Sequence, residues 1–518
     1  MSKLNAKSVS LRREGNEFFN QKCYYNAMLK YNESLCLAEL DSETLGLAYA
    51  NRSDIYFEMK LYNHCLKNIN LAKQNKYPEL NAVVLNEREE KCLNALKQDK
   101  RENDCTDAQQ LFKLSYAQNK NITFVIDCLE MKNDSTYGRH IVTNKSLKVG
   151  DVVAIEEPFC KIVRDEYVQQ ICSWCFKSNM MDLIPCRSCT KAMFCSADCE
   201  TKACQTFHKY ECPVMEITSK LSKNLQMALR TLYVVLAIFD DSIHDLQKYI
   251  LNHPEICTIF DVKGLDERSK FLAINSLIAN DKIDIRKEVL EEISQWSSKL
   301  KEIWSTHGDF IAQFLHRQIQ VATVNYHEIY SWPLKKGGFF DKDIDKLPDA
   351  FAYQRVTVSA GNGSYPFCSL LNHSCAPNVG KIFVNDKIVL IVQRPIEKGA
   401  QLFDNYGYHF TNMSKDCRQK ELLKQYKFLC NCDACKHNWP ILTNLKIANK
   451  LNLNKAKKVC RELKMLEVNR KKAMSKYKEL CDIVNKNHKN FPSVEMCSIM
   501  ESMAAYLEMS LKPSLQFV

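Results

Sequence analysis

The segment from residue 172 to residue 212 constrains the fold more than any other feature, because it places eight potential metal ligands at regular spacings. It reads CSWCFKSNMMDLIPCRSCTKAMFCSADCETKACQTFHKYEC. Its ligand pairs are Cys172-x2-Cys175, Cys186-x2-Cys189, Cys195-x3-Cys199 and His208-x3-Cys212. A C-x2-C knuckle directs both sulfurs at one ion, and the wider spacings put two ligands one helical turn apart. Eight ligands make two tetrahedral zinc sites, and metal binding should supply much of the folding free energy of so short a segment. Cys204 fits none of the pairs and is predicted to be a free thiol.

The cysteine content of the whole chain also favours metal binding over disulfides. There are 25 cysteines among 518 residues, an odd number, and many stand at C-x2-C spacings, which in a reducing compartment indicates metal. The opening residues, MSKLNAKSVSLRREGN, lack the apolar run of a signal peptide, and the longest apolar stretch, Leu232 to Phe239, is too short to span a bilayer. We therefore expect a multi-domain monomer in the cytoplasm and nucleus, with no membrane partner.

An internal repeat opens the chain. Residues of a first copy return 38 positions later in a second, and the matched pairs are Gly15 and Ser53, Ala27 and Cys65, Tyr31 and Ile69, and Ser34 and Ala72. Each copy has the pattern of two amphipathic helices joined by a tight turn. The arrangement resembles tetratricopeptide (TPR) repeats, whose usual period is about 34 residues, and a further helix from about Leu80 to Lys97 would cap the stack. A plain helical bundle is the alternative interpretation, and peptide binding in the groove of the repeat is a further expectation.

Two β-rich regions flank the cysteine-rich segment. Short β-branched runs between Ile122 and Val163 predict consecutive strands with tight turns. Residues 213–320 have a helical pattern, and β-runs return in YPFCSLLNHSCAPNVGKIFVNDKIVLIVQRPIEKGAQLFDNYGYHF. The polar residues that follow Leu370 and Leu371 in this second region are costly to bury unless each finds a partner, so they indicate a functional site.

Three motifs, SLLNHSCAPN, DNYG and QYKFLCNCDAC, together resemble the SET methyltransferase domain, and residues 172–212 resemble the MYND zinc finger. Their order is that of the SMYD family, in which a MYND finger interrupts the SET sequence. The resemblance covers about Ile122 to Trp439 and implies an α+β fold, in which a β-rich SET domain is split by the finger and a helical insert. The expected divisions are 1–100 for TPR-like helical repeats, 122–170 for the first part of the SET domain, 172–212 for the finger, 213–320 for the helical insert, 321–412 for the SET core, 413–440 for a post-SET zinc segment and 441–518 for a helical carboxy-terminal region.

The resemblance also assigns the metal ligands. Because ligand pairs interleave in MYND fingers, one zinc ion would take Cys172, Cys175, Cys195 and Cys199, and the other would take Cys186, Cys189, His208 and Cys212. A third group, Cys430, Cys432 and Cys435, supplies three ligands where a closed site needs four. The family's N-H-S-C motif implies that Cys375 is the fourth, for three zinc ions in total. Cys417 and His437 are alternatives, since both lie close in sequence.

The activity that the resemblance implies is transfer of a methyl group from S-adenosylmethionine to a lysine amine. The implied cofactor-binding residues are Gly138, Arg139, His140, Asn325, Asn372, His373, Tyr406 and Phe428. Tyr406 is also the implied catalytic tyrosine, and Tyr426 would line the lysine channel as a second catalytic residue. The chain departs from the family where Gly138-Arg139-His140 replaces Gly-x-Gly, which puts a side chain where bare backbone would approach a ligand. Gly399-Ala400-Gln401 also replaces the more usual Gly-Glu-Glu.

Two functions from different classes follow. The favoured one is a protein-lysine methyltransferase, acting on a histone or non-histone protein, whose finger and repeats recruit protein partners. The alternative is a catalytically weak or inactive scaffold that acts as a transcriptional corepressor or adaptor, and His140 is the residue that argues for it.

Basic residues are concentrated near the carboxy terminus. Between Lys446 and Glu479, twelve Lys or Arg stand against three Glu, with apolar residues Ala456, Val459, Cys460, Leu463 and Leu466 at helical spacing. An amphipathic helix with a solvated basic face is the preferred interpretation, and contact with nucleic acid or an acidic partner is the alternative. The finger has five Lys or Arg against four acids, too small a surplus for binding dominated by phosphate contacts.

Overall fold

The amino-terminal helices form two helical hairpins. They are α1 (Asn5–Asn20), α2 (Tyr24–Leu37), α3 (Glu43–Glu58) and α4 (Tyr62–Gln74), followed by α5 (Ala82–Leu96). The repeated positions are buried where helices meet, and a Cβ on Gly15 would stand 2.4 Å from the Tyr31 ring, so only glycine allows this close approach. The interpretation of the hairpins as TPR-like repeats stays a prediction.

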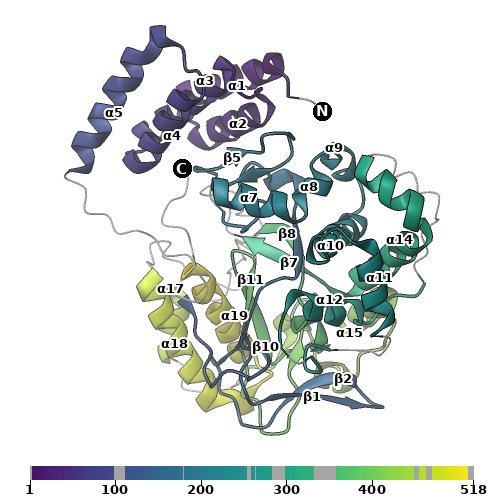
Figure 1. Ribbon diagram of the computed structural model, residues 1–518. Coiled ribbons are helices and arrows are strands. Elements are labelled where there is room, and N and C mark those ends of the chain that lie inside the picture. The colour runs from purple at the N-terminus through teal and green to yellow at the C-terminus, as the bar shows by residue number, and fades with distance from the viewer. Residues whose placement is uncertain are drawn as a thin grey trace.

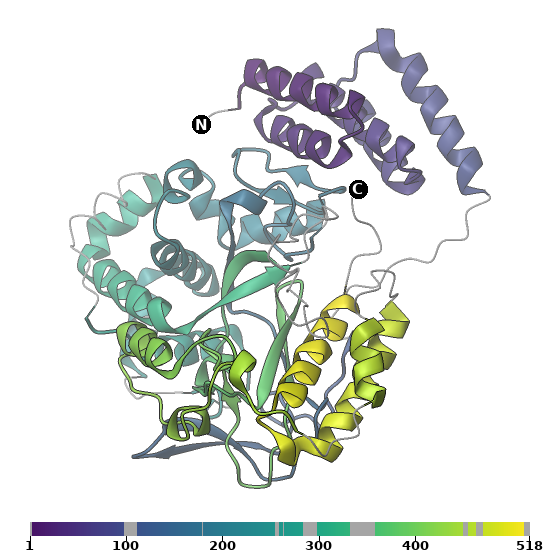
Figure 2. The same ribbon diagram turned by 180° about the vertical axis from the view of Figure 1, so that it is seen from behind.

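The computed structural model describes residues 3–97, 111–178, 180–253, 258–262, 264–282, 298–331, 358–448, 454–462 and 470–511. In Figure 1 the amino-terminal helices lie above the finger, the insert helices lie to the right, and the helices between residues 454 and 509 cover the central strands at the lower left. Figure 2 shows from behind that α5 projects away from the rest of the molecule. In these parts of the chain, none of the helices is both long enough and apolar enough to cross a membrane.

Strands from both sides of the finger build the central β region. They are β1 (Leu129–Asp134), β2 (Gly138–Thr143), β3 (Val152–Glu156), β4 (Cys160–Val163), β7 (Tyr326–Ser331), β8 (Val358–Ser364), β9 (Asn372–His373), β10 (Val379–Val384), β11 (Lys387–Val392) and β12 (Phe403–Asp404). One antiparallel sheet has the order β10-β11-β3 and a second has the order β4-β8-β7. β1 and β2 form a hairpin, and β9 and β12 form a short parallel pair. Since β3 and β4 precede the finger and their partners follow it, the finger and the insert are inserted into one folded unit.

The finger itself contains a two-stranded sheet and two helices: β5 (Ile184–Pro185), β6 (Met193–Phe194), α7 (Ala197–Gln205) and α8 (His208–Glu211). Ser196 caps α7, since its hydroxyl accepts a hydrogen bond from the backbone N–H of Cys199. The insert is helical, as its pattern predicts, with α9 (Met215–Thr218), α10 (Lys223–Ile238), α11 (Ile243–Leu251), α12 (Glu267–Asn275) and α14 (Ser298–Asn325).

The carboxy-terminal helices are α15 (Lys415–Tyr426), α16 (Asp433–Lys436), α17 (Asn454–Glu462), α18 (Arg470–Asn487) and α19 (Val494–Met509). The last three bury an apolar face against β10 and β11, where Tyr506 and Leu480 share a core with Ile391. Ala456, Val459 and Cys460 of the basic stretch are buried, as an amphipathic helix predicts, whereas Leu463 and Leu466 lie outside the described residues. The mixture of helices and sheets predicted from the sequence is confirmed.

Candidate active site and metal centres

Two groups of four ligand atoms lie in the finger. The first is Cys172, Cys175, Cys195 and Cys199, and the second is Cys186, Cys189, His208 and Cys212, with the atoms of each group within 4.8 Å of one another. Cys195 Sγ is 3.6 Å from Cys175 Sγ and 3.5 Å from Cys199 Sγ. Two thiolates on one tetrahedral zinc ion stand about 3.8 Å apart, so both the donor set and the spacing fit zinc. The grouping is the interleaved one that the family resemblance implies, and Cys204 is exposed and outside both groups.

The second finger group is supported from outside by an ion pair. His208 Nε2 faces Cys186 Sγ at 3.2 Å, while its Nδ1 lies 3.3 Å from Glu211 Oε1. Arg230 of α10 donates to both Glu211 oxygens at 2.8 Å. Burial raises the pKa of Glu211, but the charge of Arg230 and the hydrogen bond from His208 outweigh burial and hold the pKa below its ordinary value. Such an outer partner fixes the orientation of a metal-binding imidazole and ties the finger to the insert.

The third group brings Cys375 together with Cys430, Cys432 and Cys435. Cys375 Sγ is 3.9 Å from Cys430 Sγ and 3.5 Å from Cys435 Sγ. The other candidates for the fourth ligand, Cys417 and His437, are exposed and do not belong to the group. The group joins the N-H-S-C turn of the SET core to the segment that follows α15.

The charge around the third group fits a divalent metal. Arg418 of α15 is fully buried, with 0% of its surface exposed, and it donates to the backbone oxygen of Met413 and, at 3.7 Å, to Cys435 Sγ. Burial lowers the pKa of Arg418, but Cys435 and Cys375 outweigh burial and raise it. Four thiolates around Zn²⁺ carry a net charge of about −2, and a buried guanidinium needs such a counter-charge. Together with the two finger groups, the chain could hold three zinc ions.

The glycine turn of the candidate cofactor site is the β1–β2 hairpin. Gly138 adopts a φ of +61°, which favours glycine, and Asn372 Nδ2 donates to the backbone oxygens of Tyr137 at 2.9 Å and Arg139 at 3.4 Å. The His140 ring is buried and turns back on the hairpin, with Nδ1 2.8 Å from the Gly138 oxygen. The hairpin also contacts residues 399–401, where the sequence differs from the family's usual Gly-Glu-Glu. The Thr143 N–H donates to the Ala400 oxygen at 3.1 Å.

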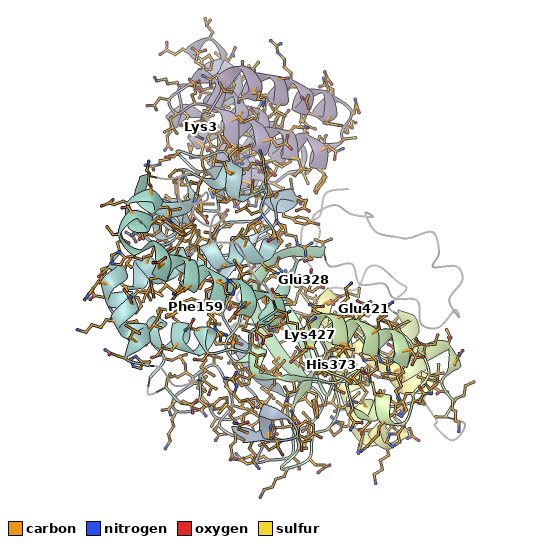
Figure 3. The ribbon with its side chains drawn as sticks, turned by 90° about the vertical axis from the view of Figure 1, so that its right-hand side faces the viewer. Lys3, Phe159, Glu328, His373, Glu421 and Lys427 are labelled. Atoms are coloured by element: carbon orange, nitrogen blue, oxygen red, sulfur yellow. The ribbon has the colours of Figure 1, made fainter. Side chains whose placement is uncertain are left out.

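A cluster of rings surrounds Tyr406. The backbone N–H of Tyr406 donates to His373 Nδ1 at 3.0 Å, so a neutral His373 carries its proton on Nε2, which lies 3.4 Å from Cys375 Sγ. Burial lowers the pKa of His373 to about 4, which favours this neutral form. The ring centroids of Tyr406 and Tyr426 are 4.7 Å apart, and those of His373 and Phe428 are 6.1 Å apart. Figure 3 labels His373 and, on the segment that follows α15, Lys427.

The Tyr406 hydroxyl donates to the backbone oxygen of Leu371 at 2.8 Å. Burial, and after it the charge of Asp404, raise its pKa far above the ordinary value, so the hydroxyl keeps its proton at neutral pH. Burial likewise raises the pKa of Tyr426, whose ring stands beside it. The two predicted catalytic residues therefore lie together as uncharged hydroxyl groups.

Asn325 and Arg139 both reach the segment that follows α12. Asn325 Nδ2 donates to the backbone oxygens of Ile278 at 2.6 Å and Val321 at 2.7 Å, and Arg139 Nη2 donates to that of Ser276 at 3.1 Å. Arg139 Nη1 is buried and has no hydrogen-bond partner among the residues that the structure describes. A buried donor without a partner suits a carboxylate, such as the one at the amino-acid end of S-adenosylmethionine.

Sequence reasoning missed a partly buried charged network that includes Asp404, two residues before Tyr406. Lys381 Nζ lies 2.5 Å from Asp404 Oδ2 and 3.2 Å from His327 Nδ1. Burial, followed by the Lys381 charge, lowers the pKa of His327 well below its usual value, so its ring is neutral. Asp404 stands inside the DNYG motif and could have been found, but the positions of His327 and Lys381 in the sequence carry no such indication. Arg418, Glu211 and Arg230 were missed for the same reason.

Residues 4–407 match the family model described as SET domain. The chain is 22% identical over 502 residues to protein-lysine N-methyltransferase SMYD4 of Danio rerio, and the match covers 82% of this chain and 65% of the relative. It is 23% identical over 543 residues to SMYD4 of Homo sapiens, covering 82% and 66%, and 24% identical over 320 residues to histone-lysine N-methyltransferase SMYD1 of Homo sapiens, covering 58% and 54%. The chain thus spans slightly less than two thirds of the length of these SMYD4 relatives.

A solved SET domain of LSMT bound to lysine and AdoHcy is 11% identical, covers 74% of this chain and 85% of that one, and has a TM-score of 0.22, too low to compare the two folds. The family model, by contrast, covers most of the chain. The relatives bear the name SMYD, which is the family that the sequence motifs resemble. The chain belongs to the SET-domain family, within its SMYD group.

Proposed function

We propose that the chain is a protein-lysine methyltransferase that uses S-adenosylmethionine. The observation that carries the proposal is the ring cluster around Tyr406, in which a hydroxyl of raised pKa is held by the Leu371 carbonyl oxygen beside Tyr426 and His373. A lysine amine has to be oriented and stripped of water before it can act as a nucleophile. Aromatic walls with uncharged hydroxyl groups suit that task, because burial disfavours the charged ammonium form.

Bound S-adenosylmethionine would supply an electrophilic methyl group on a sulfonium sulfur. The residues that would hold it come from four separate segments, which explains why the site needs the whole SET fold. Arg139 offers the buried Nη1 donor, Asn372 fixes the hairpin turn, and Phe428 lies over the His373 side of the site. The Asn325 amide donates both of its hydrogens to backbone oxygens. Its role would therefore be to position the segment that follows α12, which Arg139 also contacts.

Replacing the Tyr406 hydroxyl tests the proposal. Tyr406→Phe should keep cofactor affinity, measured by calorimetry, and lower methyl transfer by roughly a hundredfold or more, because one orienting hydroxyl is lost in a water-poor site. Tyr408→Phe is the matched control, since Tyr408 bonds through its hydroxyl to Gln425 and should leave the rate unchanged. Undiminished transfer by Tyr406→Phe in a radiolabelled methyl assay would contradict the proposed role.

The competing proposal is a SET and MYND scaffold that acts as a corepressor or adaptor. His140 is the specific observation in its favour, because an imidazole stands at a position where the family usually has glycine. Calorimetry with S-adenosylmethionine separates the two proposals, since a scaffold without cofactor binding gives no heat. In either case we propose that the finger and the amino-terminal helices contact protein partners, in the cytoplasm and the nucleus.

A further inference from the structure

The amino-terminal helices hold one short segment of the finger through side chains that converge on it. The segment is Met180–Leu183, and the side chains that hold it are Asn32, Arg52, Tyr56, His64 and Lys67, which we call the docking face. Figure 1 shows α2 directly above the strand β5 that follows the segment.

Most of these contacts reach the backbone of the segment. Asn32 Nδ2 donates to the Met180 oxygen at 2.8 Å, Arg52 Nη1 donates to the Leu183 oxygen at 2.6 Å, and the Tyr56 hydroxyl donates to the Met181 oxygen. Three carbonyl groups within four residues are thus bound by side chains of two helices, α2 and α3. Backbone recognition of this kind accepts any chain that can present its carbonyl groups in the same way.

Hydrogen bonds within the amino-terminal helices hold the Arg52 donor in place independently of the finger segment. Arg52 is fully buried, and its Nε and Nη1 donate to Asn68 Oδ1 at 2.7 Å and Asn32 Oδ1 at 2.8 Å. Its Nη2 is buried and has no hydrogen-bond partner in the described part of the chain. A buried guanidinium held by two amides is costly unless a ligand with strong acceptors is part of the design.

The side chains of the segment define what the docking face prefers. Asp182 Oδ1 lies 2.8 Å from His64 Nδ1 and 3.7 Å from Lys67 Nζ. Met180 and Leu183, on either side of it, are completely buried. The matching ligand is therefore a short peptide segment with an acidic residue between apolar residues.

We propose that the docking face is a peptide-binding site, that Met180–Leu183 is its resident ligand, and that a partner protein with an aspartate flanked by apolar residues competes with it. The inference does not depend on methyl transfer, because no residue of the candidate active site takes part. A ligand on the same chain acts at an effective concentration of the order of millimolar, so it excludes a weakly binding partner until its own contacts are loosened.

The experiment measures binding of a fluorescent peptide with the sequence of residues 177–185, KSNMMDLIP, to the full zinc-loaded chain by anisotropy. Asp182→Lys should repel the resident segment from His64 and Lys67 and bind the peptide about tenfold more tightly than wild type does. Asp198→Lys makes the same charge reversal on a finger side chain that is 67% exposed, and it should behave as wild type. Adding His64→Ala and Lys67→Ala to Asp182→Lys should abolish the gain.

Three results would overturn the proposal. Wild type and Asp182→Lys could bind the peptide with equal affinity, or the gain in affinity could persist after removal of the His64 and Lys67 side chains. The third is that no variant binds the peptide. A second measurement guards against a misfolded Asp182→Lys protein. Saturating peptide added to wild type should speed hydrogen exchange of the amides of residues 180–184, and unchanged exchange counts against competition. In both measurements S-adenosylmethionine affinity should stay constant, which keeps this test separate from that of the proposed enzyme.

Discussion

Several buried charged side chains in this protein hold two parts of the chain together. Glu156, at the end of β3, is fully buried, and its two oxygens accept hydrogen bonds from the backbone N–H groups of Phe367 at 2.7 Å and Cys368 at 2.8 Å. It thereby fixes the turn that leads into the N-H-S-C motif. Burial raises its pKa to about 7, despite these two hydrogen bonds.

The raised pKa of Glu156 predicts a pH dependence of stability. The folded protein binds this proton more tightly than the unfolded chain, whose glutamate pKa is about 4.3, so the contribution of Glu156 falls as pH rises from about 4.3 to about 7. Urea unfolding at several pH values should therefore give a free-energy difference between wild type and Glu156→Gln that falls by about 3 kcal/mol over this window. A difference that does not change with pH would contradict the assignment.

Arg418 is the second residue whose replacement is informative. Arg418→Met removes the positive charge beside the Cys375 group, and a chelator should then extract one of the three zinc ions about tenfold faster than from wild type. Arg187→Met is the control, because the side chain of Arg187 is 74% exposed and pairs with Glu200 in the finger. Equal release from the two variants would mean that Arg418 does not balance the thiolates.

At the scale of elements, α15 connects the third cysteine group to the ring cluster around Tyr406. Arg418 near its start contacts the third cysteine group, Tyr426 at its end stands beside Tyr406, and Lys427 stops the helix in the left-handed conformation, with φ at +64°. The zinc ligands Cys430, Cys432 and Cys435 follow at once. Loss of this metal should therefore loosen the residues that line the site.

Cys375→Ser tests this link. Elemental analysis should find about two zinc ions in place of three, and S-adenosylmethionine binding should weaken with the lost metal, because serine is a poor replacement for a thiolate. Cys204→Ser and Cys417→Ser, both at exposed thiols outside the three groups, should keep all the metal and the affinity. Three zinc ions in Cys375→Ser would place the fourth ligand elsewhere.

The metal-ligand groups could be predicted from the sequence because metal binding requires ligands at short, fixed spacings along the chain. Two thiols on a C-x2-C knuckle have to face one ion, whereas Cys375 is indicated only by the resemblance of the N-H-S-C motif to the family. Lys381, Arg418 and Arg230 could not be found in this way, because a buried charge is defined by a partner that folding brings from a distant segment. The predicted catalytic and cofactor residues cluster, but Asn325 directs its amide at the backbone and not at an open site.

At the scale of the molecule, the docking face joins the amino-terminal helices to the finger. The repeat pattern in the sequence gives no indication of the docking face, because repeat periodicity describes internal packing only. Asn32 is central to the contact: it is fully buried and donates to the oxygens of Gln169 and Met180 at 2.8 Å.

Asn32→Ala should therefore speed hydrogen exchange in two places at once, in α2–α4 and at residues 180–184, by about tenfold or more, while β10 and β11 stay protected. Asn5→Ala is the matched control, since Asn5 is partly exposed and its side-chain amide bonds to Glu39 within the amino-terminal helices. Faster exchange in the helices alone would show that the helices and the finger open independently.

The pairing of strands across the finger and the insert also fixes an order of events during synthesis. Cys160 in β4 pairs with Ser364 in β8, and Glu156 in β3 pairs with Ile388 in β11, so neither sheet can form until the ribosome has made the whole segment between them. The amino-terminal helices and the finger are complete long before that point. We expect them to fold first, around zinc, while β3 and β4 wait with unpaired edges, which makes a nascent chain deprived of metal prone to aggregate.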